Sequence, residues 1–477
     1  MQVRILTFLL AISFFASAQD STFNKTDLNS VAKVFDLTFT QKEIDTLYSD
    51  VKDNLYNYKS MHKLTLNNAT PLSMWQTPVV SGMKFNTVQQ PVKWGTINAL
   101  SVPANKNELA FYSIEQLAYL IKNKKISSVD LTRFFIERIK NYGDTLQCLI
   151  SLTESLALEQ AKQADAEIAT GKYKGLLHGI PYGLKDLFAV KGTKTTWGAE
   201  PYKNQMIDED AYVYAKLKEA GAVLVAKFTL GALAMGDYWY GGRTKNPWNL
   251  KYGSSGSSAG STAATVAGLV PFAIGTETWG SIVSPSTTCG ATGLRPTFGT
   301  ISRSGAMALS YSLDKVGPIC RSAADAAVVF NYLHGTDGKD LSAVNMPFNY
   351  DAVKPVKNYK IAYAKNYFDK IKDTTRAEWV ALKAFEKMGV TLIPVNFPDS
   401  GVYKFNIMDV IIGVECAAQF DDLTRSNQDD ALTRQTKNDW PNQFRTARFV
   451  PAVEYVNAQR HRYVLMKDVN EAIAPFD

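Results

Sequence analysis

Helices that lead directly into short apolar strands recur along this chain, and this alternation limits its fold more than any other feature. Residues 208–220 are predicted to form a helix, with acidic residues in the first turn and Gly221 as its stop. The apolar run 222–226 follows at once and predicts a buried strand. The same alternation recurs around residues 360–363 and 390–394. The pattern predicts an α/β domain on a mostly parallel or mixed sheet.

Two helices are predicted to open this domain. Ser113 begins the first and Ser127 the second, and each is followed three residues later by a side chain that completes a capping motif, Gln116 or Asp130. The last predicted helix covers residues 455–472. The chain stops soon after it.

The first eighteen residues have the pattern of a targeting segment. Arg4 is a positive start, residues 5–15 are almost all apolar, and Ala16-Ser-Ala18 matches a small-residue cleavage site. The apolar stretch is shorter than the ~20 residues that span a bilayer. We therefore expect cleavage near Ala18 and export to the periplasm or medium, and no stable membrane span. The alternative is an ordinary buried N-terminal helix.

Residues 19–105 are predicted to be an accessory region that is mainly helical at its start. Residues 43–59 carry apolar side chains at helical spacing (Ile44, Leu47, Val51 and Leu55), with Asp45, Asp50 and Asp53 off that face. The stretch 67–103 is rich in proline and polar residues and is expected to be extended. Its role stays open between a lid or interface and simple packing.

Charge and cysteine content exclude several classes of function. The net charge of +7 is spread over 52 basic and 45 acidic residues without a dense basic block, so nucleic-acid binding is not indicated. The four histidines form no metal-binding cluster. The four cysteines are far apart and fit no redox spacing, which favours single buried thiols. No metal and no cofactor is expected.

Seven serines lie between Gly253 and Pro285, most of them in a glycine-rich run (253–261). A flexible linker is excluded because the run leads into residues 262–270, which have the pattern of a packed helix. A phosphate loop is excluded because no Gly-Lys-Ser/Thr ending follows. Gly256-Ser-Ser-Ala-Gly260 matches the nucleophile elbow of α/β-hydrolases with Ser258 as nucleophile, but the preceding residues are polar instead of a buried strand.

Lys185 lies in an apolar setting within His178-Gly-Ile-Pro-Tyr-Gly-Leu-Lys-Asp186. A lysine with an ordinary pKa near 10.4 costs about 4.6 kcal/mol to use as a neutral base at pH 7, unless burial lowers its pKa. Asp186 should point the opposite way if the segment is extended. From local composition, a buried base and a solvated lysine at a strand end are equally expected.

Six segments, in order along the chain, resemble the motifs of the amidase signature family. They are the Gly-Ile-Pro…Lys-Asp segment ending at Asp186, Asn246-Pro-Trp, the Gly-Ser-Ser-Ala-Gly-Ser run, Gly275-Thr-Glu-Thr-Trp-Gly-Ser-Ile282, Gly293-Leu-Arg-Pro-Thr297 and Ser312-Leu-Asp-Lys-Val-Gly-Pro318. The resemblance covers residues 106–477. It implies a mixed β-sheet covered by helices on both faces. In relatives the last helix usually leads to a further strand, so we expect this domain to be truncated at its C-terminus.

The resemblance also assigns roles by position. Ser281 becomes the nucleophile, Ser257 the bridging serine after a cis Gly256–Ser257 peptide, and Lys185 the base. The implied oxyanion hole consists of backbone N–H groups of Thr278, Trp279, Gly280 and Ser281. The Ser258 and Thr276 hydroxyls are expected to support the lysine.

Two positions depart from the family pattern. Trp279 replaces a frequent glycine, and its indole is expected to narrow or roof the acyl pocket. Val283 stands where many members have arginine, and the Ile-Val-x-Pro form resembles the branch that includes bacterial peptide amidases. Trp239 and Tyr240 are equally expected to be pocket walls or core.

The resemblance implies a hydrolase acting on a small or peptide-like carboxylic amide. Two alternatives remain: an A-type amidotransferase subunit that releases ammonia for a partner enzyme, and a catalytically inactive binding protein. The identity of the amide, a preference for amides or esters, and the oligomeric state are not determined by the sequence.

Overall fold

The structure, a computed structural model, describes residues 23–35, 37–61, 68, 77–398 and 407–477. The predicted targeting segment, residues 1–18, lies outside the described residues. The chain forms two compact units, residues 1–65 and 66–477. The domain boundary predicted at residue 105 stays a prediction.

The smaller unit contains two helices, α1 (Lys25–Val34) and α2 (Gln41–Met61). Asn24 caps α1 by accepting from the backbone of Thr26 and Asp27. Helix α2 confirms the predicted amphipathic helix: Ile44 is buried, whereas Asp45 and Asp50 are exposed.

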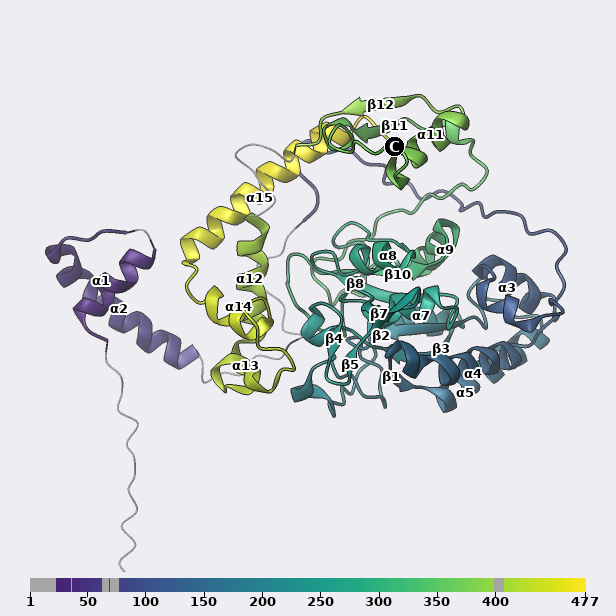
Figure 1. Ribbon diagram of the computed structural model, residues 1–477, viewed down its shortest axis with the longest axis horizontal. Helices are drawn as coiled ribbons and strands as arrows, with labels where there is room; N and C mark the ends of the chain where they lie inside the picture. The colour runs from purple at the N-terminus through teal and green to yellow at the C-terminus, as the bar shows by residue number, and fades with distance from the viewer. Residues whose placement is uncertain (1–22, 36, 62–67, 69–76, 399–406) are drawn as a thin grey trace, which may run out of the picture. The chain divides into compact units, whose positions relative to one another are not determined.

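In the larger unit, residues 77–105 have almost no regular structure, and the chain continues as alternating helices and strands (Figure 1). Its first half contains α3 (Ile114–Lys122), α4 (Ser128–Leu146), β1 (Leu149–Leu152), α5 (Glu154–Ala169), β2 (Pro181–Lys185), α6 (Tyr212–Glu219), β3 (Val223–Phe228), β4 (Tyr238–Trp239), β5 (Gly242–Arg243), β6 (Lys245–Asn246) and β7 (Asn249–Gly253). The second half contains α7 (Ala259–Val266), β8 (Ala273–Glu277), α8 (Val283–Cys289), β9 (Thr292–Gly293), β10 (Lys315–Cys320), α9 (Ala323–Leu333), β11 (Ile361–Ala364), α10 (Lys365–Phe368), α11 (Ala377–Lys387), β12 (Leu392–Val395), α12 (Ile407–Gln419), α13 (Asp421–Arg425), α14 (Trp440–Ala447) and α15 (Ala452–Ile473).

A six-stranded mixed sheet forms the centre of this unit, in the order β1-β3-β2-β8-β10-β9. Strands β3, β2 and β8 are parallel, and β1, β10 and β9 join antiparallel. Both faces of the sheet are buried. Adjacent residues of a strand point to opposite faces, and adjacent residues of β3 pack in different hydrophobic clusters. Val223 packs in a cluster with residues of α4, α5 and α7, and Leu224 in one with residues of α3, α6 and α9. The predicted mixed sheet with helices on both faces is confirmed.

The two capped helices predicted to open this domain are also confirmed. Ser113 and Gln116 form a reciprocal capping box at the start of α3, and Ser127 caps α4 by accepting from the Asp130 N–H. All four cysteines are buried free thiols. Within the described residues, no helix is both long and apolar enough to cross a membrane.

Two predictions about the helix–strand alternation need correction. The helix predicted over 208–220 begins only at Tyr212. The N–H groups of Ala211 and Tyr212 donate to Ala189 O and Ser304 O, and not to carbonyl groups of a preceding helical turn. Strands β11 and β12 form a separate two-stranded parallel sheet and do not extend the central one. Periodicity does not say which strands pair.

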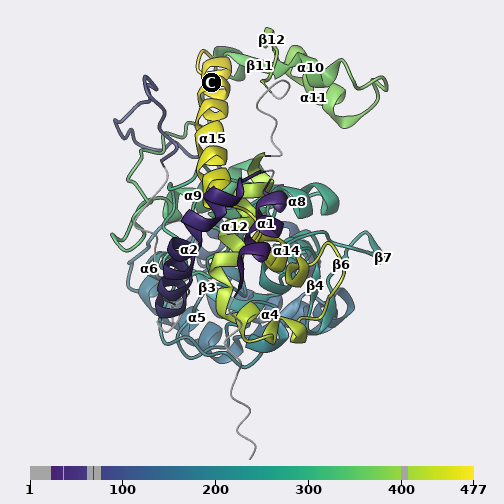
Figure 2. The ribbon, with the colours of Figure 1, turned by 90° about the vertical axis from the view of Figure 1, so that its left-hand side faces the viewer.

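The C-terminal helices form a layer beside the strand that carries the last family motif. Helices α12 and α15 contact each other, and both reach the loop 309–314 through the Glu415 and Arg462 side chains. The end of α15 lies beside the β11–β12 sheet (Figure 2), where Asp477 and Lys360 exchange two hydrogen bonds of 2.8 and 3.0 Å.

Candidate active site

Lys185 is the last residue of β2, which lies between β3 and β8 and is buried along its whole length. Its ammonium is enclosed by hydroxyl groups. Nζ donates to Ser257 Oγ at 2.8 Å, to Ser258 Oγ at 3.1 Å and to Thr276 Oγ1 at 2.9 Å. Burial lowers the pKa of Lys185 to about 7, although the Asp314 and Glu277 carboxylates partly oppose this shift. The solvated alternative for Lys185 is therefore wrong.

The Ser258 hydroxyl can only accept a hydrogen bond from Lys185, because its own hydrogen is used elsewhere. Its hydroxyl donates to Thr276 O at 3.0 Å, so towards Lys185 the Ser258 oxygen acts as an acceptor. A neutral lysine has two N–H bonds and one lone pair. In this neutral form Ser258 and Thr276 accept from the two N–H groups, and the lone pair faces the Ser257 hydroxyl. Nζ then accepts from Ser257, whereas in the charged ammonium form it donates to Ser257.

The glycine-rich run holds Ser257 with almost no exposure, at 1%. The Gly256–Ser257 peptide is cis, as the resemblance implied. A Cβ on Gly256 would lie 1.7 Å from Gly236 O, so only glycine fits this approach. Helix α7 begins at Ala259, directly after the two serines.

Ser281 follows β8 at the end of a tight segment, residues 278–281. We call it the oxyanion segment because the resemblance predicts that its backbone N–H groups form the oxyanion hole. Gly280 in this segment has φ +95°, a conformation that side chains rarely adopt. Ser258 N donates to Ser281 O at 3.0 Å, which ties the segment to the serine run. Ser281 is 8% exposed. Within the described part of the chain, no direct hydrogen bond joins the Ser281 and Ser257 hydroxyls.

Three charged side chains that sequence reasoning missed hold the oxyanion segment or the residues directly after it. Glu277 Oε2 accepts from the N–H groups of Ile282 and Val283 at 2.8 and 2.9 Å. Asp314 Oδ1 accepts from Thr278 Oγ1 at 2.5 Å, and Lys315 Nζ donates to Thr278 O at 3.2 Å. All three belong to the family motifs. Glu277 is the last residue of β8, Lys315 is the first residue of β10 and Asp314 directly precedes it, so a charged residue at the end of an otherwise apolar strand was the available signal.

Asp186 points away from Lys185, as predicted. It forms a buried ion pair with Lys227 of β3 at 2.9 Å and accepts from Thr196 Oγ1 at 2.5 Å. Burial raises the pKa of Asp186, and the neighbouring Lys227 ammonium opposes this shift. The pair supports the strand ends that carry Lys185.

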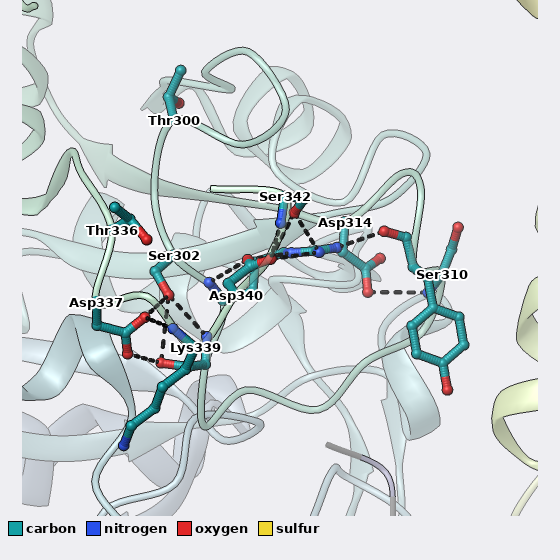
Figure 3. Close-up of polar contacts among 12 residues, drawn as sticks. Thr300, Ser302, Ser310, Asp314, Thr336, Asp337, Lys339, Asp340 and Ser342 are labelled. Atoms are coloured by element: carbon teal, nitrogen blue, oxygen red, sulfur yellow. Dashed lines mark hydrogen bonds and ion pairs between the residues drawn. The ribbon is translucent and has the colours of Figure 1, made fainter. Parts of the chain in front are cut away.

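A cavity of about 250 Å³ borders this site through Thr276 and Thr278. Its wall is largely apolar and also includes Asp314, Lys315 and an ion pair between Arg303 and Asp340 at 2.8 Å. Figure 3 shows polar contacts that two acidic residues of this wall make: Ser342 Oγ donates to Asp340 at 2.6 Å, and Ser310 N donates to Asp314 at 3.0 Å.

The aromatic residues near the serine run do not line this cavity. Trp279 is 49% exposed, and Trp239 and Tyr240 pack edge to face on each other at 4.9 Å. Val283 begins α8 with its side chain exposed. No group of His, Cys, Asp or Glu within the described ranges could hold a metal ion.

Comparison with known proteins links these motifs to a family. The amidase family model matches residues 130–475. The A-type subunit of glutamyl-tRNA(Gln) amidotransferase from Coxiella burnetii is 41% identical over 294 residues, which are 60% of this chain and 61% of that protein. The chain thus spans about three fifths of the length of the curated relatives it matches.

Solved structures give the same picture. The peptide amidase from Stenotrophomonas maltophilia superposes with a TM-score of 0.63 at 26% identity, over 73% of this chain and 78% of that one. An inhibitor-bound vestigial protein complex, studied for the origins of an s-triazine catabolic enzyme, gives a TM-score of 0.70 at 26% identity, over 77% and 80%. With the six ordered motifs and the mixed sheet, these matches establish that the chain belongs to the amidase signature family.

Proposed function

We propose that this chain hydrolyses a carboxylic amide, small or peptide-like, through an acyl-enzyme on Ser281. The observation that carries the proposal is the 2.8 Å contact between Lys185 Nζ and Ser257 Oγ, made by a lysine with a pKa of about 7. At neutral pH about half of the Lys185 side chains are then neutral, which a proton-accepting base requires.

The reaction proceeds by two proton relays. Neutral Lys185 takes the Ser257 proton. The Ser281 hydroxyl, which must first move into hydrogen-bond contact with Ser257, gives its proton to Ser257 as Ser281 Oγ forms a bond to the amide carbon. Backbone N–H groups of the oxyanion segment donate hydrogen bonds to the former carbonyl oxygen and stabilise its negative charge. When the C–N bond breaks, the same proton returns through Ser257 to the leaving nitrogen. Water then hydrolyses the acyl-enzyme and regenerates Ser281.

A panel of primary amides, peptide amides and anilides tests this proposal, with released ammonia or amine and the acyl-enzyme mass as readouts. Ser281→Ala should abolish both signals. Ser255→Ala is the matched control, because the Ser255 hydroxyl bonds Ser284 at 2.7 Å and lies outside the lysine's contacts. Turnover that survives in Ser281→Ala would contradict the proposal.

A second function is favoured by one observation, the 41% identity to the A-type subunit of glutamyl-tRNA(Gln) amidotransferase. In that case glutamine would be the amide, and a partner enzyme would consume the ammonia. Glutamine hydrolysis faster than that of every peptide amide in the panel would favour this alternative. Faster hydrolysis of a peptide amide would favour the first.

We also propose that the mature protein is exported, on the pattern of residues 1–18 alone. N-terminal sequencing of protein recovered from cell fractions tests this. A mature start at Gln19 outside the cytoplasm is expected, and full-length protein in the cytoplasm would contradict it.

A further inference from the structure

Lys315 lies beside the oxyanion segment in a way that the relay does not use. It is the first residue of β10 and pairs with Glu277 of β8 in the antiparallel register. This register places the Lys315 side chain next to the oxyanion segment, which follows β8. Its Nζ donates to Thr278 O at 3.2 Å and also to Leu313 O.

The carbonyl that Lys315 contacts shares a peptide group with an oxyanion donor. Thr278 C=O and Trp279 N–H belong to one planar unit, so fixing the carbonyl also fixes the direction of the N–H. A hydrogen bond from a cation to the carbonyl polarises the group and makes its N–H a stronger donor. The Thr278 side chain is held separately by Asp314.

We propose that Lys315 is a positioning residue for the reaction, whose ammonium orients and polarises the Thr278–Trp279 peptide so that its N–H stabilises the oxyanion. The inference rests on the proposed function, because it assigns a role within that site. Lys315 touches neither the scissile bond nor the relay, and acts only through this peptide.

The charge of Lys315 is sensitive to pH in the working range. Burial lowers the pKa of Lys315 to about 8, with Arg295 and Arg462 acting in the same direction and the Asp314 and Glu277 carboxylates opposing them. Lys315 is therefore charged below pH 8 and loses its charge above it. Lys185 has the opposite requirement, because it acts as a base only when it is neutral. With a pKa of about 7, it is mainly neutral above pH 7. The two lysines together predict a narrow optimum between pH 7 and 8.

The test measures the second-order rate of Ser281 labelling by a fluorophosphonate between pH 6 and 10, corrected for hydrolysis of the probe. Lys315→Met should lower the rate about tenfold at pH 7.5 and abolish the decline above pH 8. Lys315→Arg keeps a cation that stays charged throughout, so it should retain most of the rate and also lose the decline. Lys251→Met, at an exposed lysine of β7, is the matched control and should behave like the wild type.

The outcomes are separable. A wild type that does not react overturns the proposed function itself. A reactive wild type with an unchanged rate and profile in Lys315→Met overturns only the role of Lys315. If Lys315→Met does not fold, Lys315→Arg is the deciding variant. A labelling rate that still declines above pH 8 in Lys315→Arg overturns the proposal, because a group other than Lys315 would then cause the decline.

Discussion

Lys185 Nζ lies 2.8 Å from Ser257 Oγ, and this contact joins two segments that are 72 residues apart in the chain. It forms because β2 ends beside β8 and the serine run crosses the end of both strands. The lysine is buried among hydroxyl groups, and within the described ranges no carboxylate forms a hydrogen bond with it. This setting keeps its pKa low while its position stays fixed.

Replacing Lys185 should stop the relay at its first step. Lys185→Met keeps most of the buried volume and removes the proton acceptor, so kcat should fall at least a hundredfold. Initial rates on whichever amide of the panel is hydrolysed check this. Lys251→Met serves as a control for the loss of one positive charge. A drop smaller than tenfold would exclude Lys185 as the base.

The rate should fall as the pH drops below 7. The folded pKa of Lys185 is about 7, so each further unit of acidity lowers the neutral, active fraction about tenfold. At pH 5 we expect kcat/KM to be about one hundredth of its maximum. The profile of kcat/KM from pH 5 to 7.5 measures this, and a rate that stays level down to pH 5 would rule out a neutral lysine base.

Glu415 should be important for stability. From α12 its buried carboxylate accepts from Ser310 Oγ, from Ser312 Oγ at 2.7 Å and from Tyr455 OH at 2.8 Å, which joins the C-terminal helices to the loop before β10. Glu415→Gln turns one acceptor into a donor and should lower the free energy of unfolding by about 1–3 kcal/mol.

Chemical denaturation compares Glu415→Gln with Glu386→Gln, an exposed carboxylate on α11. The exposed change should alter the free energy of unfolding by less than about 0.5 kcal/mol. Equal effects of the two substitutions would show that the Glu415 contacts contribute nothing to the fold.

The buried pair of Lys227 and Asp186 gives a second stability test. Lys227→Met leaves the Asp186 carboxylate buried without its cation and should cost about 3–5 kcal/mol. Adding Asp186→Asn removes the unpaired charge and should recover part of this loss. Thermal unfolding of the single and double variants checks it. No recovery in the double variant would mean that packing, and not the charge, is the cause.

The parts of the site that lie in ordered motifs could be predicted from the sequence. Lys185, Ser257, Ser258 and Thr276 meet as expected, since the resemblance gives their positions and an apolar strand explains the burial of Lys185. The role that we propose for Lys315 could not be predicted, although the residue lies in a motif, because this role depends on the register between β10 and β8. That register is a long-range property which local patterns do not specify.

The fold shows the same division. The amphipathic helix near the N-terminus and the capped helices after Ser113 and Ser127 follow from local pattern. The late start of α6 does not, because its first N–H groups bind Ala189 O and Ser304 O, which are distant in sequence. The pairing of β11 with β12 alone is likewise a tertiary outcome.

Mass spectrometry of the folded protein after incubation with a fluorophosphonate tests the role of Ser281 most directly. We predict one adduct that maps to Ser281, is absent from Ser281→Ala, and persists in Ser255→Ala. A folded wild type that forms no adduct, or an adduct that maps to Ser257 or Ser258 instead, would contradict the assignment of Ser281 as the activated nucleophile.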